Sequence, residues 1–436
     1  MRLIRLLKRD IAREAAEWVE EGIISEPQAE QVCQRYGVDF HDIKNHSLAY
    51  SMLLGLGYLF IGLSLITLIG ANWETIPREV RMGGLLLLTA MTQGLGIYRY
   101  SRGDRRAAGG FFFLGNLFYG ASIILIAQIY HLGEHMPDGV FWWALGWLPM
   151  AVLTRQPLLT IPMLALALLW FFMEAHMGFY PALMPLFLVA GLWVLCRSDS
   201  SLTLLLLVTS GILFWLEYSL GFWWNDFYRL ELFPEHLPLS GALLLLLYTV
   251  GATLAARNDA VSRDYGVTLD LWVVRGTVLC LLVMSYREPW KALLDGPWTH
   301  LPSLLVLMLS VLAIALSLGW RMGLAKIVAA LGSGLLLLLG AVLVSGSGEH
   351  GLYFQVLANL LLVGFGAGLI VQGIRNGLSH YFFLGVATVL FTAFVRYLDL
   401  IGDYVGGAAL FFVFAMLLLG AARYWKYRQR QGEGEA

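Results

Sequence analysis

The sequence predicts an all-α fold: a polytopic bundle of about fourteen transmembrane helices with a small cytoplasmic helical hairpin at its N-terminus. The first observation is a series of apolar stretches, each long enough to cross a hydrocarbon core of about 30 Å with about 20 helical residues. The second is the composition, which is 58% hydrophobic and 14% charged with a mean hydropathy of +0.70. Soluble domains are about 45–50% apolar and about 25% charged. The third is the distribution of Lys and Arg between the loops.

Short polar or glycine-containing segments separate the apolar stretches. The predicted spans cover residues 49–70, 82–98, 109–130, 139–153, 157–175, 178–196, 201–222, 238–256, 270–286, 302–319, 324–345, 351–373, 379–398 and 404–422. The predicted domains are therefore a cytoplasmic headpiece at 1–48, a transmembrane bundle at 49–422 and a basic cytoplasmic tail at 423–436.

Lys and Arg are unevenly divided between alternate loops. If the N-terminus is cytoplasmic, most of the 29 Lys and Arg residues fall in the headpiece, the inner loops and the tail. Cytoplasmic loops of membrane proteins carry this excess. A wrong number of spans would exchange the two sides partway along the chain and remove the segregation. We therefore expect an even number of crossings, with both termini in the cytoplasm.

The headpiece contains two short amphipathic patterns. Apolar residues recur at helical spacing up to Val19, and Ser25 with Gln28 has the spacing of a capping box at the start of a second helix. A hairpin of this size cannot bury a core large enough to fold alone. It is either a packing cap over the cytoplasmic end of the bundle or a docking or regulatory module.

Several functional classes find no support in the sequence. The formal net charge of −1 argues against a nucleic-acid partner. The three cysteines are far apart and give no disulfide or metal spacing. His131 and His135 are four residues apart, but Gly133 between them disfavours a regular helix, and the HExxH pattern is not met. We expect no cofactor, no bound metal and no catalytic residue, and the chain is not predicted to be an enzyme.

Three segments resemble a known family. They are the helix pair from Trp18 to Tyr36, the segment from Ala71 to Pro77, and the stretch from Gly115 to His131. In these segments the chain is similar to the bacterial membrane proteins grouped as domain of unknown function 2157 (DUF2157), over about residues 10–175. The resemblance implies an inner-membrane protein without an established activity, encoded with a periplasmic partner. It carries over no catalytic residue.

Polar residues at membrane depth are the first candidates for a substrate path, because such residues are costly in lipid and usually face a bundle interior or a cavity. Asn116 and Gln128 lie in the third predicted span, near its cytoplasmic and outer ends respectively. They either line a path or form hydrogen bonds between helices, which contribute about 0.6 kcal/mol on average.

Arg396, Asp399 and Asp403 form a second candidate group. Their spacings of three and four residues place them on one helical face at the outer end of the thirteenth span. The group is either a charged gate or an ion pair that anchors the helix at the headgroup level.

Two further patterns concern the helix ends and the packing. Glu174 and Glu217 close apolar spans at the predicted outer level, where we expect them to reach water. Gly364 and Gly368 form a small-xxx-small pair in the twelfth span, a pattern that favours close helix packing.

The sequence leaves three activities open. We expect transport or translocation of a small or lipid-like substrate across the inner membrane. The alternatives are a scaffold or sensor that couples a periplasmic partner to the headpiece, and an intramembrane enzyme acting on a lipid-linked substrate. The expected partners are membrane lipids and a periplasmic or membrane protein.

Overall fold

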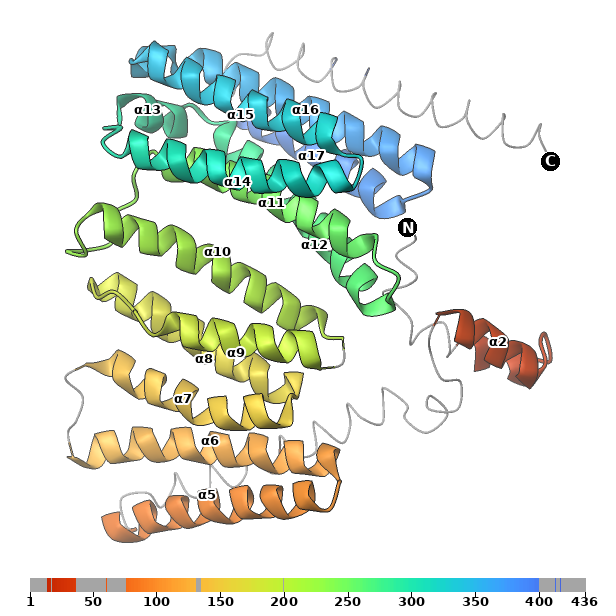
Figure 1. Cartoon of the computed structure of the whole chain (residues 1–436), viewed down its shortest axis with the longest axis vertical. Helices are drawn as coiled ribbons and strands as arrows, with labels where there is room; N and C mark the ends of the chain where they lie inside the picture. Colours follow the sequence, from red (N-terminus) through yellow and green to blue (C-terminus); the bar gives the residue numbers. More distant parts are fainter. Residues whose placement is uncertain are drawn as a thin grey trace. The chain divides into compact units, whose positions relative to one another are not determined.

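The computed structural model describes residues 14–16, 18–36, 60, 76–130, 135–198, 200–399, 412 and 416, with the backbone alone at 35, 36, 398 and 399. Throughout these residues the regular structure is helical, and none of them lies in a strand (Figure 1). Two compact units divide the chain, one formed by His46–His236 and the other by Met1–Asn45 together with Leu237–Ala436.

Antiparallel helices in sequence order build the unit His46–His236 (Figure 1). They are α5 (Arg78–Ser101), α6 (Arg105–Tyr130), α7 (Met136–Thr154), α8 (Pro157–Met177), α9 (Met184–Arg197) and α10 (Leu202–Trp224). Each packs on its sequence neighbour, α5 on α6 and α7 on α8 most extensively. The turns after α5, α7 and α9 share one end of the unit, which carries Arg102, Arg155 and, as the last residue of α9, Arg197.

Short connections fix the antiparallel direction of neighbouring helices. Arg155, between α7 and α8, has a left-handed backbone with φ 54°, and Gly178 ends α8 with φ 88°. Pro157 begins α8, where the missing N–H of proline leaves no helical hydrogen bond unmade. The core between these helices is aromatic: Trp147, Phe171 and Phe187 are almost fully buried.

The second unit contains seven further α-helices and a short 3₁₀ turn. They are α11 (His236–Ala255), α12 (Ala260–Met284), α13 (Arg287–Asp295), α14 (Leu301–Arg321), α15 (Ala325–Ser345), η2 (Gly348–His350), α16 (Gly351–Asn376) and α17 (Ser379–Asp399). The Asp259 side chain caps α12 by accepting a hydrogen bond from Ser262 N at 2.8 Å. Hydrogen bonds from the hydroxyl and the backbone N–H of Ser262 lower the pKa of the Asp259 carboxyl.

Helix α13 is short and amphipathic, and several contacts hold it against the unit. Trp290 and Leu294 are buried, and the Trp290 ring stacks on Phe354 of α16 at 5.2 Å. Trp290 Nε1 also donates to the Met284 carbonyl at 2.6 Å. At the end of α13, Asp295 Oδ1 accepts from Gly348 N at 2.7 Å. The segment between α12 and α14 is therefore an ordered part of the unit.

The headpiece has helical residues at 14–16 and 18–20, followed by α2 (Glu26–Tyr36). Gln28 Oε1 accepts from the backbone N of Ser25 at 2.9 Å, which is one half of the predicted capping box. A small buried cluster of Ala15, Ala29 and Cys33 joins the two segments. The headpiece belongs to the same compact unit as Leu237–Ala436.

Ten of the described helices are long and apolar enough to cross a membrane: α5, α6, α8, α10, α11, α12, α14, α15, α16 with η2, and α17. Helix α7 has 19 residues and corresponds to the fourth predicted span, whereas α9, with 14 residues, is shorter than the sixth. Of the first and last predicted spans, 49–70 and 404–422, the structure describes only residues 60, 412 and 416, and the domain boundaries near 48 and 422 lie outside the described residues. Fourteen spans remain a prediction.

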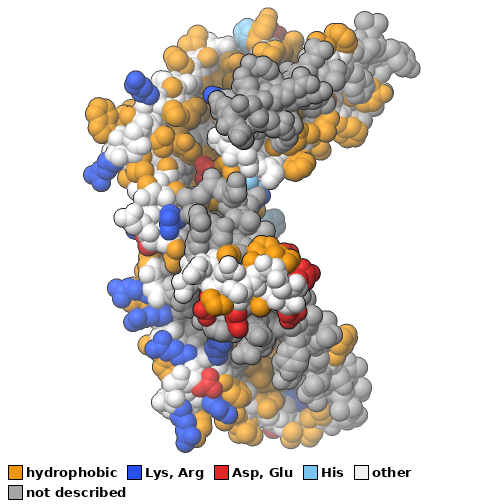
Figure 2. Space-filling view, turned by 90° about the vertical axis from the view of Figure 1, so that its right-hand side faces the viewer, with side chains coloured by type: hydrophobic (Ala, Val, Ile, Leu, Met, Phe, Trp, Pro, Cys, Tyr) orange, Lys and Arg blue, Asp and Glu red, His pale blue; other side chains and the backbone are white. Residues whose placement is uncertain are grey.

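The exposed surface of the bundle is rich in large apolar side chains, as expected for a surface in contact with lipid. Leu87, Val189, Leu337 and Val344 are each more than half exposed. Figure 2 faces the end that carries the turns after α5, α7 and α9, and it shows Lys and Arg side chains among hydrophobic surface. Together with the long apolar helices, this surface identifies a multi-pass membrane protein.

The glycines that bring α16 and α17 together are not the predicted pair. Gly364 and Gly368 are exposed, and a Cβ added at either position would meet nothing within 4 Å. The close approach instead uses Gly366 of α16 and Gly385 of α17. A Cβ on Gly385 would lie 2.6 Å from the Gly366 carbonyl oxygen. Within the described residues, the close glycine contact of this helix lies on a different face from the predicted pair.

We expect Gly385→Ala to lower the stability by about 1–3 kcal/mol, because the added methyl group must push the two backbones apart. Gly364→Ala is the matched control. It adds the same methyl group in open space, and the better helix propensity of alanine should leave stability unchanged or raise it by up to about 1 kcal/mol. Thermal unfolding of both purified variants in one detergent measures the difference. Equal effects would contradict the assigned contact.

Candidate functional site

The predicted path residues Asn116 and Gln128 have different environments on α6. Asn116 is 1% exposed, and its Nδ2 donates to Phe112 O of the same helix at 3.0 Å. Its backbone carbonyl accepts from Trp143 Nε1 of α7 at 2.9 Å. Gln128 is exposed. Neither residue is among the described lining of the two pockets reported below.

The second predicted group is only partly described. The Arg396 guanidinium lies over the Tyr286 ring, with its carbon 4.9 Å from the ring centroid. This cation–π contact joins α17 to the segment after α12. The side chain of Asp399 and all of Asp403 lie outside the described residues. The predicted gate or ion pair therefore stays untested.

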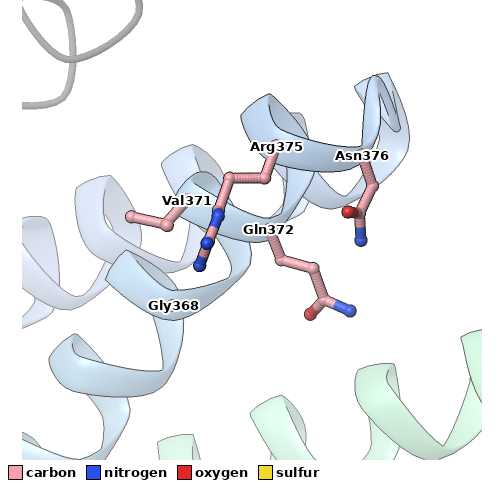
Figure 3. Close-up of a pocket in the computed structure, with 5 residues that line it drawn as sticks. All are labelled: Gly368, Val371, Gln372, Arg375 and Asn376. Atoms are coloured by element: carbon pink, nitrogen blue, oxygen red, sulfur yellow. The ribbon is translucent and has the colours of Figure 1, made fainter. Parts of the chain in front are cut away.

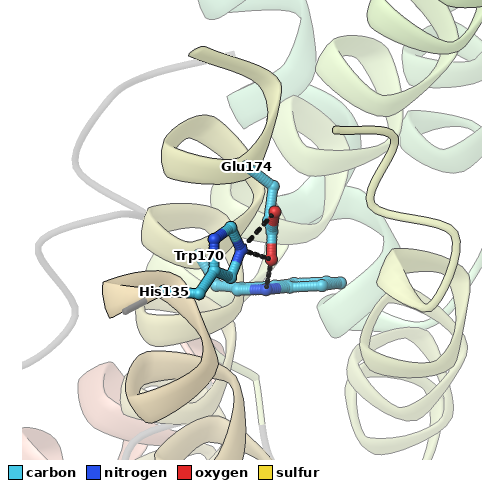
Figure 4. Close-up of polar contacts among 3 residues, drawn as sticks. All are labelled: His135, Trp170 and Glu174. Atoms are coloured by element: carbon cyan, nitrogen blue, oxygen red, sulfur yellow. Dashed lines mark hydrogen bonds and ion pairs between the residues drawn. The ribbon is translucent and has the colours of Figure 1, made fainter. Parts of the chain in front are cut away.

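A polar cluster in the unit His46–His236 joins α7 to α8 (Figure 4). His135 is the N-cap residue of α7, and Glu174 lies in the last turn of α8. Because the two helices are antiparallel neighbours, these two ends meet. His135 Nε2 lies 3.1 Å from Glu174 Oε1 and 3.0 Å from Oε2, and Trp170 Nε1 donates to Oε1 at 3.0 Å.

The environment of Glu174 differs from its prediction. Its side chain was expected to reach water, yet the residue is 7% exposed. A buried carboxylate is costly unless donors satisfy it, and here an imidazole and an indole do so. The ring of Phe179 meets the His135 ring edge-on at 5.2 Å and limits its rotation. Asp138, in the first turn of α7, brings a second, exposed carboxylate to the same place.

A second histidine–carboxylate pair lies in the same unit. His236 Nδ1 is 2.7 Å from Glu217 Oε2 of α10, and the rings of His236 and Trp224 are 5.0 Å apart. Glu217 is also more enclosed than expected, with 17% of its side chain exposed. Both carboxylates of the two pairs therefore bond to histidines that are distant in sequence.

The second unit has an ionisable residue inside a helix long enough to cross a membrane. Asp270 of α12 accepts a hydrogen bond from the Tyr381 hydroxyl of α17. It lies ten residues from the start of α12, or about 15 Å along the helix axis. Tyr248 of α11 lies within electrostatic range of both groups. Asp270 was missed because the ninth predicted span begins at residue 270, which placed this acid at the edge of the span, whereas α12 begins at Ala260.

Two pockets are present in the second unit. A shallow one of about 650 Å³ has Gly368, Val371, Gln372, Arg375 and Asn376, all of α16, as its described lining (Figure 3). The other, of about 160 Å³, is almost wholly apolar and lies between Trp290 of α13 and residues of α11, α12, α15 and α16. Neither combines a membrane-deep location with several polar groups, as a path for a polar substrate requires.

The fold and these clusters define a multi-pass integral membrane protein with polar contacts collected at its helix ends. Residues 16–160 match the model of the family described as Predicted membrane protein (DUF2157). The match confirms the resemblance over the headpiece and the helices through α7. No curated protein and no solved structure matches the chain.

Replacing Trp170 by Phe should cost about 1–3 kcal/mol of stability, because it removes a donor from a buried carboxylate while keeping an aromatic ring. Trp142→Phe makes the same chemical change at a residue that is 53% exposed, and it should have little effect. The stabilities of the two variants are compared by unfolding them in detergent. Unfolding is followed by circular dichroism of the helical backbone, a signal that does not rely on tryptophan fluorescence. A larger loss for Trp142→Phe would show that the Glu174 contact contributes little.

Proposed function

We propose that the protein is a scaffold or sensor of the bacterial inner membrane, with both termini in the cytoplasm. In this proposal the ends of the helices opposite the basic turns contact a periplasmic or membrane partner, and the headpiece transmits the interaction inside the cell. Of the three activities left open by the sequence, this one agrees best with the distribution of polar groups in the described part of the chain.

The observation that carries the proposal is the way buried hydroxyl and amide groups are satisfied. Each donates to a carbonyl of its own helix, at 2.6–3.0 Å. These residues are Thr92, Asn116, Ser122, Thr154, Thr160, Thr249, Thr268, Ser285, Thr388 and Thr392. A hydroxyl that donates to its own helix has no second hydrogen to give a passing substrate, although its oxygen can still accept, and Asn116 keeps a second N–H. Polar contacts between α7 and α8, and between α10 and His236, occur instead at helix ends.

The headpiece adds support for a docking role. Among its described residues the buried cluster consists of three small side chains, whereas Trp18 is 37% exposed and Ile23 is 65% exposed. Exposed large apolar groups on so small a module suit a partner surface. This favours the second of the two readings of the headpiece given above, a docking or regulatory module.

Transport is the second candidate, and the pair of Asp270 and Tyr381 favours it. Ionisable residues within spans often mark ion pathways or proton relays. The two candidates differ in whether water reaches the interior of the bundle. A scaffold needs a closed interior, and a carrier needs a hydrated one in at least one of its states.

Cysteine labelling tests this difference. In a variant lacking Cys33, Cys196 and Cys280, single replacements Thr160→Cys and Thr388→Cys place near-isosteric thiols at buried positions of the two units. We expect a membrane-impermeant maleimide, applied from either side, to leave both unmodified. Ser101→Cys, at the exposed end of α5, is the positive control. Labelling of Thr388→Cys at a rate near that of the control would reveal a hydrated interior and favour transport.

A further inference from the structure

His135, Asp138 and Glu174 form a convergent set of metal-ligand side chains. One ligand atom from each lies within 4.8 Å of the others. Within the described residues this is the one group of at least three His, Cys, Asp or Glu side chains that meets so closely. We propose that this set binds a divalent transition-metal ion, with Zn²⁺ as the best match. The binding is independent of the proposed function, since a scaffold or a carrier can hold the ion equally well.

The donor atoms have the chemistry that such an ion prefers. Imidazole nitrogen suits Zn²⁺, and carboxylate oxygen completes common mixed sets. Two carboxylates and one imidazole also supply negative charge for a dication. Hard ions such as Ca²⁺ and Mg²⁺ favour oxygen ligands alone, so the histidine selects against them.

The spacing within the set agrees with coordination to one ion. His135 Nε2 is almost equidistant from the two oxygens of Glu174, at 3.1 and 3.0 Å. In the tetrahedral geometry usual for Zn²⁺, bonds of about 2.1 Å put two donor atoms about 3.4 Å apart, so a small separation of the two side chains would admit the ion. Coordination would replace the hydrogen bond of the empty set with two metal–ligand bonds.

Neighbouring side chains supply the outer support that metal ligands usually need. Trp170 Nε1 donates to Glu174 Oε1 at 3.0 Å, and Phe179 lies edge-on against the His135 ring. Such contacts orient ligands and raise metal affinity. Glu174 is buried and Asp138 is exposed. The set is therefore anchored on one side and open to water on the other, which provides an entry route and a place for a water ligand.

The pair of His236 and Glu217 gives an internal control. It has a histidine and a carboxylate in contact at 2.7 Å, in the same unit and again at a helix end. It is not part of a described group of three ligands. If contact between one histidine and one carboxylate were enough to bind zinc, the pair of His236 and Glu217 would bind it as well as the set at His135.

The test uses the full-length protein in detergent, stripped with a chelator and then dialysed against buffered ZnSO₄. Metal content is measured by mass spectrometry and affinity by calorimetry. We expect one Zn²⁺ per chain. Asp138→Asn should weaken binding by about ten-fold or more, because it removes a ligand charge at an exposed position and keeps the contact of His135 with Glu174. His135→Gln should abolish binding, whereas His236→Gln should leave it unchanged.

A second measurement keeps the test independent of folding defects. Zn²⁺ should raise the unfolding temperature of the wild type and of His236→Gln equally, and that of Asp138→Asn by clearly less. The Asp138→Asn variant should itself remain monodisperse. Absence of zinc from the dialysed wild type would overturn the proposal. So would equal affinity of Asp138→Asn and wild type, since the ion would then be held elsewhere. The cysteine labelling at Thr160 and Thr388 tests the proposed function separately. Its outcome changes neither the measured zinc content nor the shift in unfolding temperature.

Discussion

The need to satisfy every polar group without help from water is the constraint on which this fold depends. In lipid an unpaired backbone N–H or carbonyl costs several kcal/mol, so spanning segments must be helices. The same constraint governs the side chains. Thr160 donates to Gln156 O, and Asn116 donates to Phe112 O, so these polar residues add nothing unpaired to the interior. Groups that need partners from another helix are mostly found where helices end.

The helix ends therefore carry most of the chemistry of the unit His46–His236. A carboxylate in the last turn of one helix can reach a side chain at the start of a neighbour, as Glu174 reaches His135. Asp270 of the other unit also finds its partner on a neighbouring helix, at Tyr381 in the first turn of α17. That contact ties α12 to α17 through a group that would otherwise be expensive to bury.

Much of the fold follows from sequence because hydrophobic length and turn residues are local signals. The predicted spans from 82–98 to 379–398 each correspond to a described helix, with ends displaced by several residues at α12 and α9. The hydrogen bond from Gly348 N to Asp295 Oδ1 did not follow, because it joins segments that are distant in sequence. The position of the glycine contact between α16 and α17 did not follow for a related reason. Spacing identifies residues on one face but not which face meets a neighbour.

The candidate site was less accessible to sequence reasoning. His135 and Glu174 were each noticed, but 39 residues separate them and no motif joins them. Their meeting could have been predicted from topology: α7 and α8 form a hairpin with a very short turn, so the start of one must lie beside the end of the other. The Arg396 group shows the opposite case. Its spacing was regular, but the structure describes only its contact with Tyr286.

The tight turns also have a consequence for biogenesis. At Arg155 the chain reverses through a left-handed residue, and at Gly377 it does so again between α16 and α17. Such connections leave too little chain for either helix to move far from its neighbour. Helices α7 and α8, and likewise α16 and α17, should therefore enter the membrane as pairs and not one at a time.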